Sequence, residues 1–319
     1  MAACPNSHCF AAQGAGCAQG HMSLTNCPTW MGTVPDTADV ATQGDDIALP
    51  WSGEAMGVYD LSFVSGRAKP ITVGIVGPES AGKTTILSAW YLLLSRGALT
   101  TADQQFGCSY TLNGWEAVAS SLRWEPGHKP SFPPHTSSRG ARAKGLLHLG
   151  IRRGGGLLKD YVFADAPGEW FSKWAVDADA DDAEGARWIS QHSDVCMIVA
   201  DRQALSGPKM GSARSAFQIL AKRVAVERRG RPTALVWTKA DVPVDPAMEA
   251  AIRLAVAKEI SDVVEFSVGV FAKSGVEPIA SFQKLFQWVL STHRPGTELP
   301  SSKANNHDPL FVYGTRSHG

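Results

Sequence analysis

The sequence lacks the features that would place a protein in a membrane or carry it across one. No stretch reaches the eighteen uninterrupted apolar residues of a membrane-spanning helix. The N-terminus has no basic segment followed by an apolar core, and the C-terminal His318-Gly319 carries no prenylation box. No internal repeat is present. These absences predict a cytoplasmic protein without a membrane span.

The chain also lacks an excess of charge of either sign. Its 30 basic residues balance 30 acidic residues over 319 positions, which makes nucleic acid an unlikely main partner. A hydrophobic content of 44% is enough to bury a sizeable core. Local runs of charge, such as the basic run that includes Arg231 and the acidic run over 177–184, are typical of solvated faces. The acidic run is alternatively a docking surface.

Cysteine is scarce except at the N-terminus, where four of the six cysteines fall within the first 27 residues. In a reducing compartment such clustering favours a metal site over disulfides. Thiolates around a tetrahedral Zn²⁺ would stabilise a segment that is too small to bury a core. Because the spacings are irregular, a loose tail with free thiols is the alternative. The candidate zinc ligands are Cys4, Cys9, Cys17 and Cys27, with His21 as a replacement for one of them.

The most specific motif is a phosphate-binding loop at residues 77–84, which fits G-x-x-x-x-G-K-[ST]. An apolar run at 71–76 precedes it and predicts a strand, and a helical pattern at 85–94 follows it. Backbone N–H groups of such a loop wrap phosphates, the lysine reaches the β- and γ-phosphates, and the threonine hydroxyl holds Mg²⁺. The candidate nucleotide-binding residues here are Gly77, Glu79, Ser80, Ala81, Gly82, Lys83, Thr84 and Thr85.

Another polar motif ends the predicted strand at 157–164. Asp165 follows that strand directly, where a carboxylate can hold the water shell of Mg²⁺. Gly168 lies three residues later and can direct its N–H at a γ-phosphate. The motif therefore predicts a second set of contacts to the same phosphates.

Two more segments, each of which follows a predicted strand, indicate which nucleobase the site binds. In the first, Thr238-Lys239-Ala240-Asp241, the lysine can lie over a purine face and Asp241 can accept two N–H bonds from guanine. Adenine offers a carboxylate no matching pair of donors, so the arrangement favours guanine. In the second, Ala272-Lys273-Ser274, the backbone can meet the guanine O6.

With these motifs in this order, residues 70–292 resemble the Ras-like, translation-factor-related (TRAFAC) class of P-loop GTPases. The resemblance implies an α/β G domain, a mainly parallel sheet with helices on both faces. It also implies GTP and GDP as ligands, Mg²⁺ as cofactor, and a GTP-binding switch read by a protein effector. Thr238 replaces the commoner asparagine. The class needs a switch threonine that ligates Mg²⁺, and Thr136 is the candidate, with Ser137 and Ser138 as possible substitutes.

Two departures from that class predict slow Mg²⁺-dependent hydrolysis. Glu169 stands where Ras-like enzymes position water with a glutamine, and Glu79 stands where Ras has a glycine. The candidate catalytic residues are Lys83, Thr136 and Glu169. The alternatives are a GTP-bound scaffold that does not hydrolyse its nucleotide and an ATP-using P-loop NTPase.

The Cys-rich head, the Asp165-Ala-Pro-Gly-Glu169 motif and the long insertion before the switch also resemble the bacterial "double-GTPase" proteins. That resemblance implies a place in multi-gene conflict systems and a second GTPase as partner.

The sequence predicts four regions. A zinc knuckle at 1–30 is followed by a linker at 31–69 with a strand at 58–64, the G domain at 70–292 with an insertion at 98–135, and a mobile tail at 293–319. Within the G domain, strands are expected near 71–76, 145–151, 157–164, 195–200, 233–237 and 264–271. Helices are expected at 83–96, 113–124, 183–192, 212–229, 246–260 and 278–291.

Overall fold

The computed structural model describes residues 27–29, 54–101, 103–123, 127, 131–133, 145–272 and 277–292. The chain divides into two compact units, Met1–Leu49 and Pro50–Gly319. Of the first unit the structure describes residues 27–29, where the Cys27 Sγ lies 3.2 Å from the Thr29 Oγ1. The fold below is that of the second unit.

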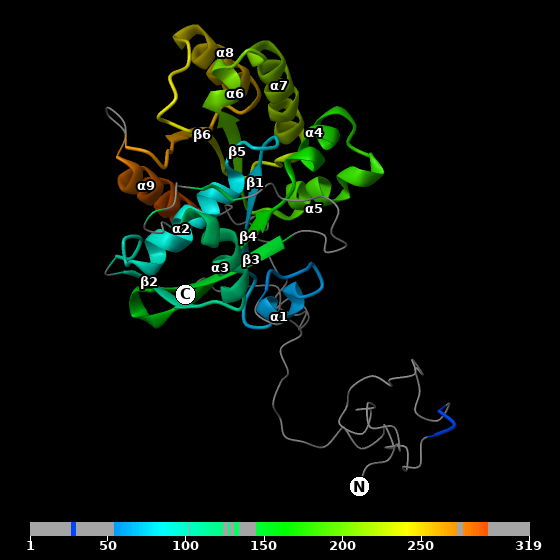
Figure 1. Ribbon diagram of the computed structural model, residues 1–319, viewed down its shortest axis with the longest axis vertical. Coiled ribbons are helices and arrows are strands. Elements are labelled where there is room, and N and C mark those ends of the chain that lie inside the picture. Colours follow the sequence, from blue (N-terminus) through cyan, green and yellow to red (C-terminus); the bar gives the residue numbers. More distant parts are fainter. Residues whose placement is uncertain are drawn as a thin grey trace, which may run out of the picture. The chain divides into compact units, whose positions relative to one another are not determined.

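Strands and helices alternate along most of the second unit (Figure 1). The strands are β1 (Ile71–Val76), β2 (Gln104–Cys108), β3 (Gly145–Arg153), β4 (Leu158–Asp165), β5 (Val195–Asp201), β6 (Thr233–Thr238) and β7 (Val264–Ser267). The helices are α1 (Leu61–Ser65), α2 (Lys83–Ser95), α3 (Leu112–Ala119), α4 (Gly168–Val176), α5 (Glu184–His192), α6 (Arg202–Ser206), α7 (Met210–Glu227), α8 (Pro246–Glu259) and α9 (Pro278–Ser291).

All seven of these strands form one sheet in the order β2-β3-β4-β1-β5-β6-β7. The neighbouring pairs from β4 to β7 are parallel, whereas β2–β3 and β3–β4 are antiparallel. The predicted α/β class with a mainly parallel sheet is therefore confirmed. In such a sheet the loops after the parallel strands meet at one edge, which places the motifs after β1, β4, β5 and β6 close together.

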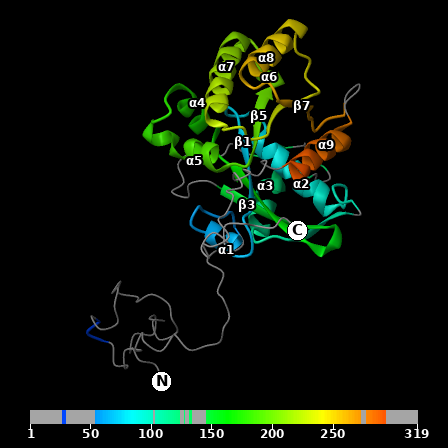
Figure 2. The ribbon, with the colours of Figure 1, turned by 180° about the vertical axis from the view of Figure 1, so that it is seen from behind.

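Successive residues of each central strand enter two separate cores, because side chains alternate across a strand. In β5, residues 195, 197 and 199 pack into one core, and residues 196, 198 and 200 pack into the other. Helices α2, α3 and α9 cover the first core, and α4, α5, α7 and α8 cover the second (Figures 1 and 2). Burial on both faces explains the nearly continuous apolar runs of the parallel strands.

The predicted insertion contributes β2 and α3, and α3 is anchored to the helix that follows the phosphate loop. The ring of Trp115 is fully buried and stacks on Tyr91 of α2, with centroids 5.8 Å apart. Its indole N–H donates to the carbonyl of His148 at 2.9 Å. The Ser88 hydroxyl of α2 also lies 2.6 Å from the Val118 carbonyl. This part of the insertion is thus packed into the sheet domain.

The strand predicted at 58–64 is wrong, because helix α1 lies there. The Asp60 carboxylate accepts the Gly57 N–H at 2.7 Å and closes a turn just before this helix, and Val64 is the buried residue of the helix. A single antiparallel bridge forms just before this segment, between Met56 and Leu146. Among the residues that the structure describes, no helix is both long and apolar enough to cross a membrane.

Candidate functional site

The phosphate-binding loop joins β1 to α2 in a tight, partly left-handed turn. Gly82 has φ of 85°, a conformation that favours glycine, and Ser80 adopts the same region with φ of 59°. A close approach favours glycine at position 77, because a Cβ added there would lie 3.0 Å from the Val199 Cβ. The Lys83 ammonium folds back over the loop and donates to the carbonyls of Gly77 at 3.0 Å and Pro78 at 2.9 Å.

Two ionisable groups at the loop, Lys83 and Asp165, are held in a buried environment. Burial lowers the pKa of Lys83 to about 8, although the charges of Asp165 and Glu79 offset part of that shift. Burial raises the pKa of Asp165 to about 6, opposed by the charge of Lys83 and by the hydrogen bond from Thr84. Strongly shifted pKa values are common at functional sites, where burial removes charged groups from water.

Thr84 and Asp165 meet directly. The Thr84 hydroxyl lies 3.0 and 3.2 Å from the two carboxylate oxygens of Asp165, which ends β4. Asp165 is only 8% exposed. A hydroxyl and a carboxylate are hard oxygen donors, so this donor set fits Mg²⁺ and its water shell.

Helix α4 starts against the phosphate loop. A Cβ added to Gly168 would lie 2.1 Å from the backbone nitrogen of Glu79, so only glycine permits this approach. Phe171 and Trp174 of the same helix are fully buried, and the Lys83 ammonium lies 5.7 Å from the Phe171 ring centroid. The helix N-terminus is therefore fixed beside the loop, although sequence analysis had not predicted a helix here.

The Thr-Lys-Ala-Asp segment begins at the last residue of β6, Thr238, and this residue ties it to the phosphate loop. The Thr238 hydroxyl donates to the Ala81 carbonyl at 2.8 Å. The Ala240 N–H donates to the Val268 carbonyl at 3.1 Å, which joins the segment to the loop after β7. Thr238 thus links the two motifs.

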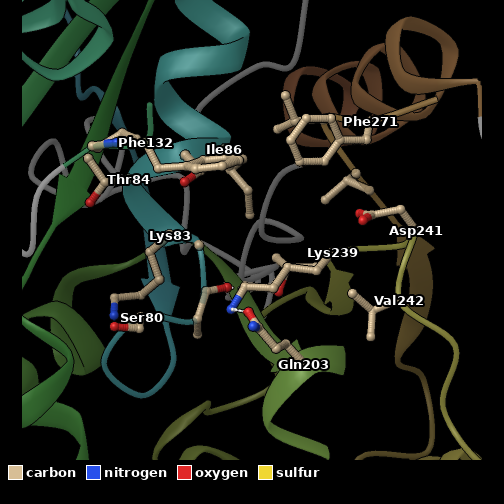
Figure 3. Close-up of a pocket in the computed structure, with 18 of the residues that line it drawn as sticks. Ser80, Lys83, Thr84, Ile86, Phe132, Gln203, Lys239, Asp241, Val242 and Phe271 are labelled. Atoms are coloured by element: carbon tan, nitrogen blue, oxygen red, sulfur yellow. Dashed lines mark hydrogen bonds between the residues drawn. The ribbon is translucent and has the colours of Figure 1, made fainter. Parts of the chain in front are cut away.

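One cavity of about 470 Å³ unites these motifs, a size usual for small-molecule sites. Figure 3 shows Lys83 and Asp241 on different sides of it. The predicted residues that line the cavity are Glu79, Ser80, Ala81, Gly82, Lys83, Thr84, Thr85, Gly168, Thr238, Lys239 and Asp241.

Sequence reasoning missed the apolar side of this cavity. The rings of Phe132 and Phe271 meet edge to face at 5.8 Å over it, and both are about half exposed (Figure 3). Phe132 belongs to a Pro-rich stretch just before the predicted switch threonine, which was the available signal for it. Nothing in the sequence pointed to Gln203. The other missed lining residues are Ile86, Pro133, Val242, Val268, Gly269, Val270 and Phe282.

Several predicted site residues do not line the cavity. Gly77 and Asp165 adjoin it through Lys83 and Thr84, and Glu169 lies in the first turn of α4. Ala272 is exposed and ends the described part of its loop, so the expected contact of its backbone with a base is not seen in the cavity lining. Thr136 and Lys273 lie outside the described residues.

The predicted zinc site falls almost wholly outside the described ranges. Cys4, Cys9, Cys17 and His21 lie outside them, and Cys27 is described and buried. Within the described ranges, no three His, Cys, Asp or Glu side chains converge as a metal site would require. The zinc knuckle stays a prediction.

A phosphate loop after β1, an acidic residue ending β4 and a Thr-Lys-x-Asp segment after β6 define a P-loop GTPase domain. Residues 71–291 match the family model described as Double-GTPase 2. This match covers more than half of the chain, and the chain belongs to that family. No curated protein sequence matches the chain.

Several solved structures are similar to the chain at low identity. Roco2 RocCORdC of Methanosarcina barkeri, bound to GDP, has 14% identity and a TM-score of 0.37, covering 70% of this chain and 50% of that one. An Era variant of Aquifex aeolicus bound to GDP·AlF4⁻ has 15% identity and a TM-score of 0.35, covering 70% and 57%. Era in complex with MgGDPNP and a segment of 16S ribosomal RNA has 17% identity and a TM-score of 0.36, covering 72% and 58%. The chain therefore spans less than two thirds of each of these solved chains, and the family assignment rests on the family match alone.

Proposed function

We propose that this protein is a GTP-binding switch that uses Mg²⁺ and hydrolyses GTP slowly. The observation that carries the proposal is the shared cavity of the phosphate loop and Asp241, which lie far apart in the chain. Lys83 and Asp241 lie on different sides of this cavity, which supports assigning the phosphates to Lys83 and the base to Asp241 (Figure 3). The carboxylate would accept the two N–H groups that guanine, unlike adenine, presents on one edge.

For Mg²⁺, we propose Thr84 as a direct ligand and Asp165 as a partner of its water shell. Their contact of 3.0 Å beside Lys83 supports this assignment. Thr136 is proposed as the switch ligand by resemblance to the GTPase class. The metal would neutralise phosphate charge, while this chain's own residues orient the nucleotide.

The base preference is tested by titrating the purified protein with GTP and with ATP in the presence of Mg²⁺. We expect GTP to bind at least about a hundredfold more tightly, because ATP leaves the Asp241 carboxylate in the cavity without its donors. Calorimetric titration measures both affinities. Equal affinities would contradict the proposal and favour the ATP-using alternative.

Slow hydrolysis follows from two carboxylates near the expected γ-phosphate. Glu79 lines the cavity, its backbone packs against Gly168 at the start of α4, and Glu169 comes next in that helix. Negative charge beside a γ-phosphate repels the charge that its oxygens carry in the transition state, which raises the barrier to hydrolysis. The same two residues favour the second candidate, a GTP-bound scaffold that does not turn over.

Single-turnover hydrolysis separates these two candidates. We expect measurable but slow phosphate release by the wild type, and about tenfold faster release by Glu79→Gly, the factor that 1.4 kcal/mol of relieved repulsion gives. A radiolabelled γ-phosphate assay with Mg²⁺ measures both rates, with a metal-free reaction as control. Tight GTP binding without any release, in both proteins, would leave the scaffold as the function.

The partner is proposed to be a protein effector, and by resemblance a second GTPase, in a cytoplasmic bacterial multi-protein system. This rests on the family match over residues 71–291. Copurification from cells that express the tagged protein, with GTP or GDP supplied in the buffer, would identify a nucleotide-dependent partner.

A further inference from the structure

The ammonium of Lys239 is held by two side chains, one at the end of β5 and one in the first turn of α6. The Lys239 Nζ lies 2.8 Å from Asp201 Oδ2 and 3.0 Å from Gln203 Oε1. Asp201 ends β5 and is only 7% exposed, so its charge is removed from solvent and paired with this lysine. Figure 3 shows the Lys239 side chain directed at Gln203, with their contact dashed.

The backbone at Lys239 is strained and well supported. Its φ of 55° lies in the left-handed region, which costs a non-glycine residue on the order of 1 kcal/mol. The flanking backbone is fixed by Thr238 to Ala81, by Ala240 to Val268, and by the Val242 N–H to the Lys239 carbonyl at 2.8 Å. These hydrogen bonds fix the backbone from which the Lys239 side chain extends. The ion pair with Asp201 fixes the position of its ammonium group.

Asp201 has two separable contacts. Its Oδ1 accepts the Gln203 N–H at 2.9 Å and caps helix α6, while its Oδ2 holds Lys239. An asparagine caps a helix about as well as an aspartate, but it carries no charge to hold a lysine. The second contact can therefore be removed while the first is kept.

From this arrangement we propose that Asp201 is a positioning residue for guanine-nucleotide binding. By holding the ammonium at the cavity edge, Asp201 lays the methylene stem of Lys239 along the space that the base occupies. It also keeps the lysine charge away from Asp241, which lines the same cavity and must stay available to the base. The inference rests on the proposed function, because it concerns how that nucleotide is held.

The test compares Asp201→Asn with Asp245→Asn. Asp245 caps α8 in the same way, accepting the Ala247 N–H at 2.7 Å, and it does not line the cavity. We expect Asp201→Asn to weaken GDP binding about tenfold or more, the usual effect of losing a charge-assisted hydrogen bond. Asp245→Asn should leave GDP affinity unchanged, and thermal unfolding should show a melting temperature within about 2 °C of the wild type for both variants.

A double-mutant cycle with Lys239→Met shows whether Asp201 acts through the lysine. In the Lys239→Met background, Asp201→Asn should change GDP affinity less than about twofold, because the ion pair is already lost. Unchanged GDP affinity in the single variant, or an equal loss in both backgrounds, would overturn the inference while the proposed function stands. Absence of GDP binding by the wild type would overturn the proposed function and this inference with it.

Discussion

Replacing Asp241 by asparagine is expected to transfer the base preference of the site from guanine to xanthine. The carboxylate lines the cavity and is half-buried, and we propose that it accepts the two N–H groups of guanine. An asparagine amide offers one acceptor and one donor, so one of the two bonds becomes a clash of donors. Xanthine has a carbonyl in place of that amino group and pairs with the amide. We expect GDP affinity to fall about a hundredfold and xanthosine diphosphate affinity to rise.

Calorimetric titration of the wild type and Asp241→Asn with both diphosphates measures this exchange. The ratio of the two affinities is the readout, because a general loss of folding would lower both together. Asp245→Asn is the matched control, since its side chain is exposed and contacts the start of α8. If Asp241→Asn kept the wild-type ratio, the side chain would not be the one that recognises the base.

Most of the sheet was predictable because its strands are buried on both faces. Residues such as Val195, Met197 and Ile198 form an apolar run. Such a run can be recognised as a buried strand without knowing which strands pair with it. The short edge strand β2 was missed, because its sequence, Gln-Gln-Phe-Gly-Cys, is neither apolar nor alternating. Its pairing with β3 comes from the tertiary fold, and Gly107 allows the close packing, since a Cβ there would lie 2.5 Å from a Leu158 methyl group.

Helix α4 shows a different limit. Its sequence, Gly-Glu-Trp-Phe-Ser-Lys-Trp-Ala-Val, opens with glycine, which lowers any helix prediction. The helix forms because Phe171 and Trp174 are buried and because Trp170 packs onto the bare backbone of Gly185 in α5. This packing depends on residues that only the fold brings together.

The residues of the candidate site also fall into those that the sequence could predict and those that it could not. The motif residues Lys83, Thr84 and Asp241 could be predicted because each lies in a short pattern tied to a strand end. Phe132, Gln203 and the contact of Asp201 with Lys239 could not, because they depend on how separate loops approach one another. The structure places the motif residues around one cavity, and the chemical roles assigned to them stay predictions.

The burial of a charged residue could not be predicted from the charge pattern of the sequence. Arg231 lies in a basic run that reads as a solvated face, yet it is only 3% exposed. Its guanidinium donates to the carbonyls of Arg228, Ser193 and Glu227, at the ends of α7 and α5. A guanidinium with five donors can satisfy several helix-end carbonyls at once, a use that charge patterning does not reveal.

Replacing Lys83 by methionine is expected to remove nucleotide binding almost completely. Methionine fills a similar volume but has no charge for the phosphates, and we expect GDP affinity to fall at least about a hundredfold. Calorimetric titration measures the loss, with exposed Lys222 replaced by methionine as the matched control. Tight GDP binding by Lys83→Met would show that the phosphate loop is not the binding element.

The same lysine gives the binding a characteristic pH dependence. Burial lowers the pKa of Lys83 to about 8 in the protein alone, and neighbouring phosphates would raise it again. The complex then binds a proton more tightly than the free protein does. GDP affinity should therefore be full below about pH 8 and fall as the pH rises through that value. Titrations from about pH 7 to pH 8.5, a range in which guanine keeps its N1 proton, measure the onset of the decline. A flat profile in the wild type would contradict a charged Lys83 as the phosphate partner.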